Sequence, residues 1–159
     1  KGSGSVSSLG RILQVVQTAK TDTFTSSSSS FTDITGLSVT ITPSSTSSKV
    51  MVIVETNTST ASGNNAILRL LRGSTAIAVG DSAGSRPQAF AQTRVNDTNA
   101  SLGSWVNFLD SPNTTSATTY KVQMLSQSGT VGINRTNADS DSSVIARTFS
   151  SITVMEVRG

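Results

Sequence analysis

The stretch FTDITGLSVTITPSSTSSKVMVIVETNTS, residues 31–59, decides the fold of this 159-residue chain. It contains two apolar runs, residues 37–41 and 50–54, which are rich in the β-branched side chains that favour strands. The link PSSTSS, residues 43–48, separates them, and its proline and serines neither continue a strand nor start a helix. The stretch therefore predicts two strands of an all-β domain.

The two strands differ in the faces that they present. Leu37, Val39 and Ile41 alternate with polar side chains, which predicts one buried and one solvated face. All five residues of 50–54 are apolar, so we expect both faces of that strand to be covered. The core would cover one face, and either a partner subunit or a long loop of the same chain would cover the other.

Short apolar runs separated by polar turns continue along the rest of the chain, with a glycine hairpin signal at residues 72–74. Strands are expected at residues 11–18, 37–41, 50–54, 66–71, 75–79, 88–95, 103–109, 118–127 and 130–134, and one or two within 144–157. This spacing predicts a single antiparallel β-sandwich over residues 10–159. The Gly/Ser-rich residues 1–9 are expected to form a flexible linker.

The composition excludes several classes of enzyme and metal site. The chain has no cysteine and no histidine, which rules out disulfides, thiolate metal sites, Ser-His-Asp triads and histidine zinc sites. About a third of the residues are serine or threonine, and only 13% are charged. We expect a polar, weakly charged, non-enzymatic protein without a cofactor.

The charge pattern also argues against two kinds of partner. The net charge is only +3, and the arginines are scattered rather than gathered into a basic stripe beside aromatic residues, so nucleic acid is not an expected partner. No apolar run reaches the roughly 18 residues that cross a bilayer, so membrane insertion is not expected either.

Several segments carry a resemblance to known proteins. GRILQVVQ (residues 10–17), followed by residues 31–49 and by TTYKVQ (residues 118–123), resembles domains in structural proteins of tailed bacteriophages, such as tail fibres. The closing segment TFSSITVMEV, residues 148–157, is similar to the terminal strand of the C1q and tumour-necrosis-factor type jelly roll. No catalytic motif accompanies the resemblance.

The resemblance implies a jelly-roll domain that forms a homotrimer at the virion surface and contacts other virion proteins. Its role would be that of a tail-fibre or spike tip, or of a capsid decoration protein, which attaches to host-surface glycans through several weak sites at once. A secreted or cell-surface C1q-like binding or filament domain of a cell is the alternative.

A trimer would need apolar contacts, and its receptor would need polar ones. The residues expected at the trimer interface are Met51, Ile53, Tyr120, Val122, Met124 and Val154. Loop residues that could donate or accept hydrogen bonds to a sugar are Asn64, Arg86, Asn99 and Arg135.

One loop carries a weak metal-binding pattern. Asn137, Asp139 and Asp141 alternate, so their oxygens could converge on calcium, which takes six to eight oxygen ligands. The glycine and distal glutamate of an EF-hand loop are missing, and we favour a solvated polar loop.

Two further sets of residues have alternative interpretations. Glu55 and Glu156, the only glutamates, could act as a glycosidase pair if they faced each other, but pairing with arginine at a subunit contact is favoured. Trp105, Phe108 and Phe90 could offer a sugar-stacking platform. Because Trp105 and Phe108 are three residues apart, they should point to opposite faces of a strand, and one of them should pack in the core.

Overall fold

The fold comes from a computed structural model that describes residues 10–159, so the linker expected at residues 1–9 lies outside the described residues. This part of the chain contains eleven strands and no helix, and thus no helix that could cross a membrane. The strands are β1 (Ile12–Lys20), β2 (Phe24–Ser26), β3 (Thr32–Ile41), β4 (Lys49–Thr60), β5 (Ala66–Arg72), β6 (Thr75–Ile77), β7 (Ala91–Thr93), β8 (Leu102–Asp110), β9 (Thr118–Ser126), β10 (Val131–Ile133) and β11 (Ser150–Val157).

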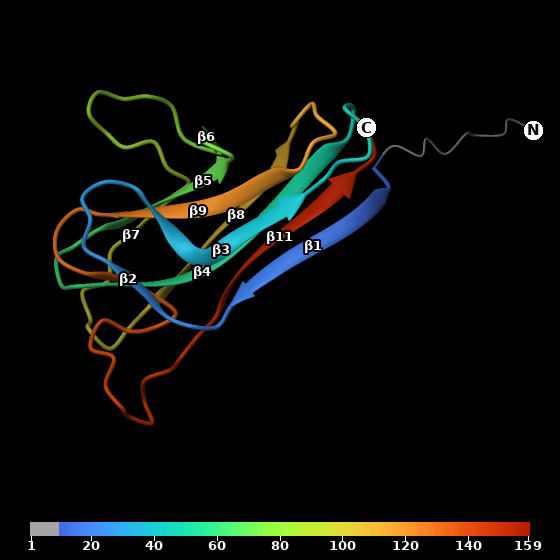
Figure 1. Ribbon diagram of the computed structural model, residues 1–159. Coiled ribbons are helices and arrows are strands. Elements are labelled where there is room, and N and C mark those ends of the chain that lie inside the picture. Colours follow the sequence, from blue (N-terminus) through green and yellow to red (C-terminus); the bar gives the residue numbers. More distant parts are fainter. Residues whose placement is uncertain (1–9) are drawn as a thin grey trace, which may run out of the picture.

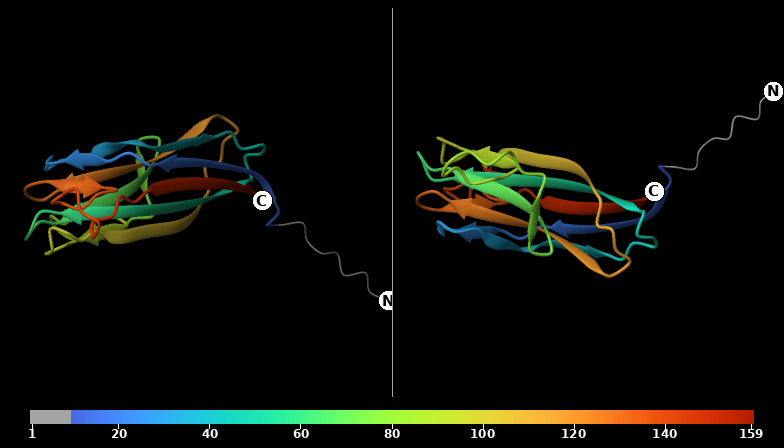
Figure 2. Two further views of the ribbon diagram at one scale, coloured as in Figure 1. Left: turned by 90° about the horizontal axis from the view of Figure 1, so that it is seen from below. Right: turned by 90° about the horizontal axis from the view of Figure 1, so that it is seen from above.

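The strands form two antiparallel sheets that lie one upon the other (Figures 1 and 2). Sheet A has the order β1, β11, β4 and β8. Beyond the start of β11, β10 takes its place beside β4, and β2 pairs with β10. Sheet B has the order β3, β9 and β5, and β6 and β7 share the far side of β5. The predicted antiparallel β-sandwich is confirmed.

The pairing of the strands is nested. In sheet A, β1 pairs with β11 and β4 pairs with β8; in sheet B, β3 pairs with β9 and β5 pairs with β6 and β7. Early strands thus pair with late ones around a central hairpin, which is the topology of a jelly roll. The jelly-roll fold expected from the resemblance is therefore confirmed by the register of this chain.

The core lies between the sheets and is built from the alternate residues of each strand. Leu37, Val39 and Ile41 of β3 are buried as predicted, whereas Ser38 and Thr40 are exposed. The other fully covered apolar side chains are Val50, Val52, Val54, Ala66, Leu68, Leu70, Tyr120, Val122, Met124, Val131, Ile133, Ile152 and Val154.

Several predicted strands are shorter than expected, including β6 and β10, which cover 75–77 and 131–133 of the expected 75–79 and 130–134. Residues 144–149 belong to a loop, because β11 begins at Ser150 opposite Lys20, where its partner β1 ends. Only Ala91–Thr93 of the expected strand 88–95 pairs with β5. The hairpin predicted at residues 72–74 is confirmed, since Arg72 pairs with Thr75.

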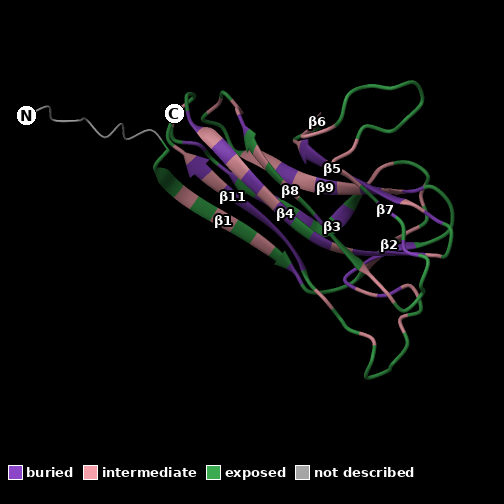
Figure 3. Ribbon diagram, turned by 180° about the vertical axis from the view of Figure 1, so that it is seen from behind, coloured by how far each residue is buried: buried purple, intermediate pink, exposed green. Residues whose placement is uncertain are grey.

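The start of β1 and the end of β11 lie at one end of the sandwich. There the Gly10 amide donates to the Arg158 carbonyl, and the Arg158 amide donates to the Arg11 carbonyl. Figure 3 shows exposed and half-buried residues alternating along β1, so one row of its side chains faces solvent rather than the core.

Candidate functional site

The outer face of sheet A carries an apolar row that crosses four neighbouring strands. Val15 of β1 lies opposite Met155 of β11, which lies opposite Met51 of β4, which lies opposite Leu109 of β8. Val15 is 55% exposed and Leu109 is 49% exposed, whereas the two methionines between them are half-buried. These four residues are called the apolar row below. An apolar row of this kind on a sheet face is a candidate surface for a partner.

The outer face of sheet B has the opposite character, because its polar side chains bind one another. Asp33 accepts hydrogen bonds from Lys121 at 2.7 Å and from Gln123 at 2.6 Å. Gln123 in turn accepts one from Arg69, whose guanidinium lies 3.9 Å from the centre of the Phe31 ring. Partner binding is therefore expected on sheet A rather than on sheet B.

The structure distinguishes between the two expected ways of covering the outer face of residues 50–54, by a loop of the same chain or by a partner subunit. Val50, Val52 and Val54 are buried against sheet B, whereas Met51 and Ile53 point outward and are half-buried. Because Val15 and Leu109 in the same row are exposed, no loop within residues 10–159 covers this face. Covering by a partner subunit, with Met51 and Ile53 in the contact, stays a prediction.

Four of the six residues predicted at the trimer interface lie elsewhere. Tyr120, Val122, Met124 and Val154 have no exposed surface in a single chain, because they fill the space between the two sheets. This part of the prediction is wrong, since a side chain without accessible surface cannot contact another subunit. Alternation identifies a buried face but does not say whether the core or a partner buries it.

A pocket of about 250 Å³ opens on the same outer face of sheet A, farther along β4. It is called the Trp105 pocket, and its lining residues are Glu55, Thr56, Asn57, Gly103, Ser104, Trp105 and Phe149. Trp105 is 71% exposed and Phe149 is 60% exposed, although large aromatic side chains are usually well covered.

The local register explains how these side chains meet. Trp105 of β8 lies opposite Glu55 of β4, and Gly103 lies opposite Asn57, so the four residues share one face. Gly103 has no side chain, and a Cβ built there would lie 3.8 Å from the Trp105 ring. The ring thus extends along the sheet over Gly103 toward Asn57. Phe149, which immediately precedes β11, completes the pocket.

Two polar side chains of the pocket, Glu55 and Asn57, have no hydrogen-bond partner among the described residues, whereas the hydroxyls of Thr56 and Ser104 are bonded to other residues of the chain. The exposed Glu55 carboxylate makes no hydrogen bond or ion pair within the described part of the chain. The amide oxygen of Asn57 is buried and likewise has no hydrogen-bond partner there. No basic side chain is among the described lining residues, so the pocket combines aromatic surface with unoccupied hydrogen-bond acceptors.

Of the three predicted stacking residues, only Trp105 is available. Phe108 lies opposite the buried Val52 and is half-buried, so the prediction that Trp105 and Phe108 point to opposite faces is confirmed. Phe90 is half-buried and packs against the core. Phe149 was not predicted, because nothing in the loop before the last strand shows from sequence that its ring lies beside Trp105.

The four predicted loop contacts differ in how accessible they are. Arg86 and Asn99 are exposed, and Arg86 lines a second surface pocket of about 260 Å³. Asn64 is only 1% exposed, and its side chain bonds Ser126 and two backbone amides, so its prediction as a ligand contact is wrong. Arg135 is half-buried and donates to two backbone carbonyls of its own loop.

The calcium hypothesis for residues 137–141 is wrong. The two carboxylate oxygens of Asp139 bind two guanidinium groups, Arg135 at 3.2 Å and Arg147 at 2.6 Å. These positive charges occupy the oxygens and repel a cation, while Asp141 is exposed to solvent. Within residues 10–159 no group of three histidine, cysteine, aspartate or glutamate side chains could hold a metal ion. Asn137 and Asp139 therefore belong to a loop that arginines hold together.

The two glutamates lie on opposite faces of sheet A, which excludes the glycosidase arrangement. Glu55 points outward, whereas Glu156 lies opposite Val50 on the inner face and is 1% exposed. Glu156 accepts hydrogen bonds from Gln14 at 2.6 Å, from the Ser44 amide at 2.7 Å and from the Ser44 hydroxyl at 2.6 Å. Its predicted pairing with an arginine is thus wrong, because neutral donors from the PSSTSS link and β1 hold it.

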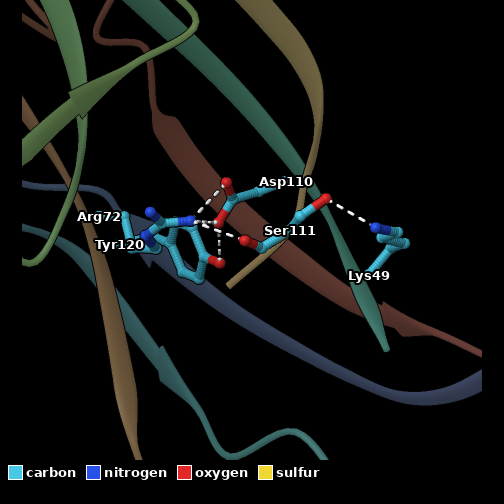
Figure 4. A network of polar contacts seen from close by, with 5 residues as sticks. All are labelled: Lys49, Arg72, Asp110, Ser111 and Tyr120. Carbon is cyan, nitrogen blue, oxygen red and sulfur yellow. Dashed lines mark hydrogen bonds and ion pairs between the residues drawn. The ribbon is translucent and has the colours of Figure 1, made fainter. Parts of the chain in front are cut away.

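A second buried carboxylate, Asp110, ties the two sheets together at the end of β8 (Figure 4). It accepts a hydrogen bond from the Tyr120 hydroxyl at 2.7 Å, and Arg72 contacts both of its oxygens at 2.8 and 2.9 Å. Burial and the hydrogen bond to Asp110 raise the pKa of Tyr120 far above its usual value of 10.0. This network is structural, because Tyr120 is fully covered.

Comparisons with known proteins give one distant structural likeness. No protein-family model and no curated protein matches the chain. Among solved structures, it is similar to the D431N mutant VP2 protein of infectious bursal disease virus in derived T=1 particles, with 12% identity and a TM-score of 0.47. The match covers 90% of this chain but 36% of that one, so the chain spans about a third of that protein's length. At this similarity the likeness carries no argument, and the fold assignment rests on strand pairing.

Proposed function

We propose that this domain is a non-enzymatic structural module of a virion, a tail-fibre or spike tip or a capsid decoration protein. It assembles as a homotrimer through the outer face of sheet A and attaches to glycans of the host surface. The apolar row is the observation that carries the proposal. The sequence resemblance to bacteriophage structural domains supports the rest of the proposal: the partners are other virion proteins, and the domain lies at the virion surface.

The chemistry of the outer faces supports self-assembly through sheet A. Val15 and Leu109 expose apolar surface to water, and burial of such surface contributes about 25 cal/mol per Å². Sheet B offers no comparable gain, because a partner there would displace hydrogen bonds that the chain already makes to itself. A trimer would then present three copies of each weak glycan site and raise the overall avidity.

The experiment measures the oligomeric state of the wild type and of two charge variants. Native mass spectrometry and light scattering at micromolar concentration are expected to give three chains of 16.4 kDa each. Val15→Asp places a charge in the apolar row and should yield a monomer with an unchanged far-ultraviolet circular dichroism spectrum. Ser38→Asp, an exposed position on sheet B, is the matched control and should stay trimeric.

A wild-type monomer at this concentration would overturn the proposed assembly. A Val15→Asp variant that remains as trimeric as Ser38→Asp would show that subunits meet through another face.

A further inference from the structure

We propose that the Trp105 pocket binds a neutral pyranose sugar, with the ring of the sugar lying on Trp105. This inference rests on the proposed attachment function, and it names the site and the ligand class within that function. It moves the attachment site from the loops to the outer face of sheet A, where β4, β8 and residue 149 meet.

The aromatic side chains carry the first step of the argument. A pyranose with mostly equatorial hydroxyls has an apolar face of C–H groups and a polar rim. The apolar face suits the flat, electron-rich face of an indole ring. Trp105 is 71% exposed, and Phe149, at 60%, borders the same pocket. The chain has only seven aromatic residues, and the two most exposed large ones line one pocket.

The polar groups beside the rings match the rim of a sugar. The Glu55 carboxylate lies directly across from Trp105 and accepts hydrogen bonds only, as does an amide oxygen such as that of Asn57. Because the Asn57 side chain makes no hydrogen bond within residues 10–159, it can turn toward a ligand hydroxyl without breaking one. A buried acceptor without a partner costs free energy, which a sugar hydroxyl would recover.

The charge of the pocket selects among sugars. Glu55 is the charged lining residue, and the described lining holds no lysine or arginine. A sialic or uronic acid would place a second carboxylate near Glu55, and like charges at short distance repel. The site therefore favours neutral hexoses or N-acetylhexosamines. A quaternary ammonium ligand suits aromatic rings beside a carboxylate as well, but it prefers an enclosing cage of rings, whereas Trp105 is largely open to solvent.

A subunit contact at this position fits the observations less well. Glu55 lies four residues along β4 from Met51 of the apolar row, roughly 13 Å at about 3.3 Å per residue, and two residues beyond Ile53, so a contact that ends at Ile53 borders the pocket without covering it. A dry interface over the pocket would bury the Glu55 charge, which has no cation within reach among the described lining residues. A sugar leaves that carboxylate solvated or hydrogen-bonded.

The experiment uses Trp105, the only tryptophan, as its own reporter. The protein is screened on an array of bacterial and animal glycans, and each glycan that binds is titrated in soluble form while tryptophan emission is recorded. Because the two Trp105 variants have no tryptophan, the affinities of the wild type and of all variants are compared by isothermal titration calorimetry. The trimers of N-acetylglucosamine and of glucose serve as neutral probes, tri-galacturonic acid as an acidic probe, and choline as the ammonium probe. The variants are Trp105→Ala, Trp105→Phe, Glu55→Gln, and Val144→Ala as a control, an 84% exposed residue outside the pocket.

Neutral glycans are expected to bind and to shift the emission of Trp105. Trp105→Ala should lose roughly tenfold or more in affinity, as is typical when a central tryptophan is truncated. Trp105→Phe should retain part of the binding, whereas Val144→Ala should bind as the wild type does. Native mass spectrometry of every variant shows whether its trimer is intact.

Other outcomes overturn the inference in distinguishable ways. If the wild type binds glycans and Trp105→Ala binds them equally well, the pocket is not the site but attachment stands. If only acidic sugars or only choline bind, the ligand class is wrong. If Trp105→Ala loses the trimer, the ring is a subunit contact. If the wild type binds no glycan on the array, both the pocket and the proposed attachment fail.

Discussion

Acid should destabilise this domain through one buried carboxylate, Glu156, and the substitution Glu156→Gln tests this. Burial alone would raise the pKa of Glu156, but hydrogen bonds from Ser44 and Gln14 outweigh it and lower the pKa from 4.5 to about 2. Folding therefore favours the ionised form. The stabilisation is fully present above pH 4.5, the pKa expected in the unfolded chain, and it is lost as the pH falls toward 2.

The shift sets the size of the effect. The difference between 4.5 and about 2 corresponds to roughly 3 kcal/mol of unfolding free energy, at about 1.36 kcal/mol per pKa unit. In Glu156→Gln one acceptor oxygen becomes an NH₂ group, which meets the NH₂ of Gln14, so one of the three hydrogen bonds is lost. At pH 7 the variant should be less stable than the wild type by up to this amount. Near pH 2 the wild-type side chain is half protonated, and the difference should have fallen to about 0.4 kcal/mol.

The assay is urea unfolding, followed by circular dichroism, at half-unit steps from pH 2 to pH 7. The quantity of interest is the difference in unfolding free energy between wild type and variant, because other carboxylates cancel in it. Glu55→Gln is the matched control, since Glu55 is the only other glutamate and lies exposed on the opposite face of the same sheet. That variant should follow the wild-type curve.

A difference that stays constant from pH 7 to pH 2 would refute the reasoning, because it would mean that the lost contacts are steric rather than linked to ionisation. A Glu55→Gln variant with the same pH-dependent loss would show that overall charge, not the contacts of Glu156, governs the acid response.

Two further predictions concern the core and one close packing contact. Burial and Asp110 raise the pKa of Tyr120, the only tyrosine, so the ultraviolet absorbance of tyrosinate should appear only when the protein unfolds in alkali. Ionisation of Tyr120 near pH 10, while the circular dichroism spectrum is still native, would contradict this. A Cβ at Gly132 would lie 2.7 Å from the Ser59 hydroxyl, so Gly132→Ala should lower the unfolding free energy, measured in urea, by about 1–3 kcal/mol. Gly80→Ala is the control and should be neutral, because a Cβ at Gly80 would have no other atom within 4 Å.

The fold could be predicted from local patterns, because the alternation of apolar and polar residues shows which face of a strand is buried. The alternation of Leu37, Val39 and Ile41 identified a sandwich strand, and the PSSTSS link identified the turn that follows it. The partners of that link could not be predicted. Glu156 lies more than 100 positions later in the chain, and only the meeting of β11 with the end of β3 brings its carboxylate to Ser44.

The candidate site was harder to predict, because exposure depends on the whole sheet. The apolar character of Met51 and Ile53 indicated a partner, but their neighbours Val15 and Leu109 join the same row only through the register of β1, β11, β4 and β8. Tyr120, Val122 and Met124 looked equally apolar and proved to be core. Sequence alternation separates the two faces of a strand, and only the packing of the sheets distinguishes core from interface.

Assembly and ligand binding are energetically linked in the proposed function. The Trp105 pocket is shallow and open, so a single copy should hold a sugar weakly, since a small contact must offset the entropy lost on binding. A site of this strength becomes useful only when several copies are held in fixed positions, because each further contact then forms within one complex. The apolar row supplies that fixed arrangement without covering Glu55 and Trp105. The outer face of sheet A would thus hold two sites, a contact that joins the subunits and a pocket that binds sugar weakly, and the trimer would raise the overall affinity by presenting three such pockets.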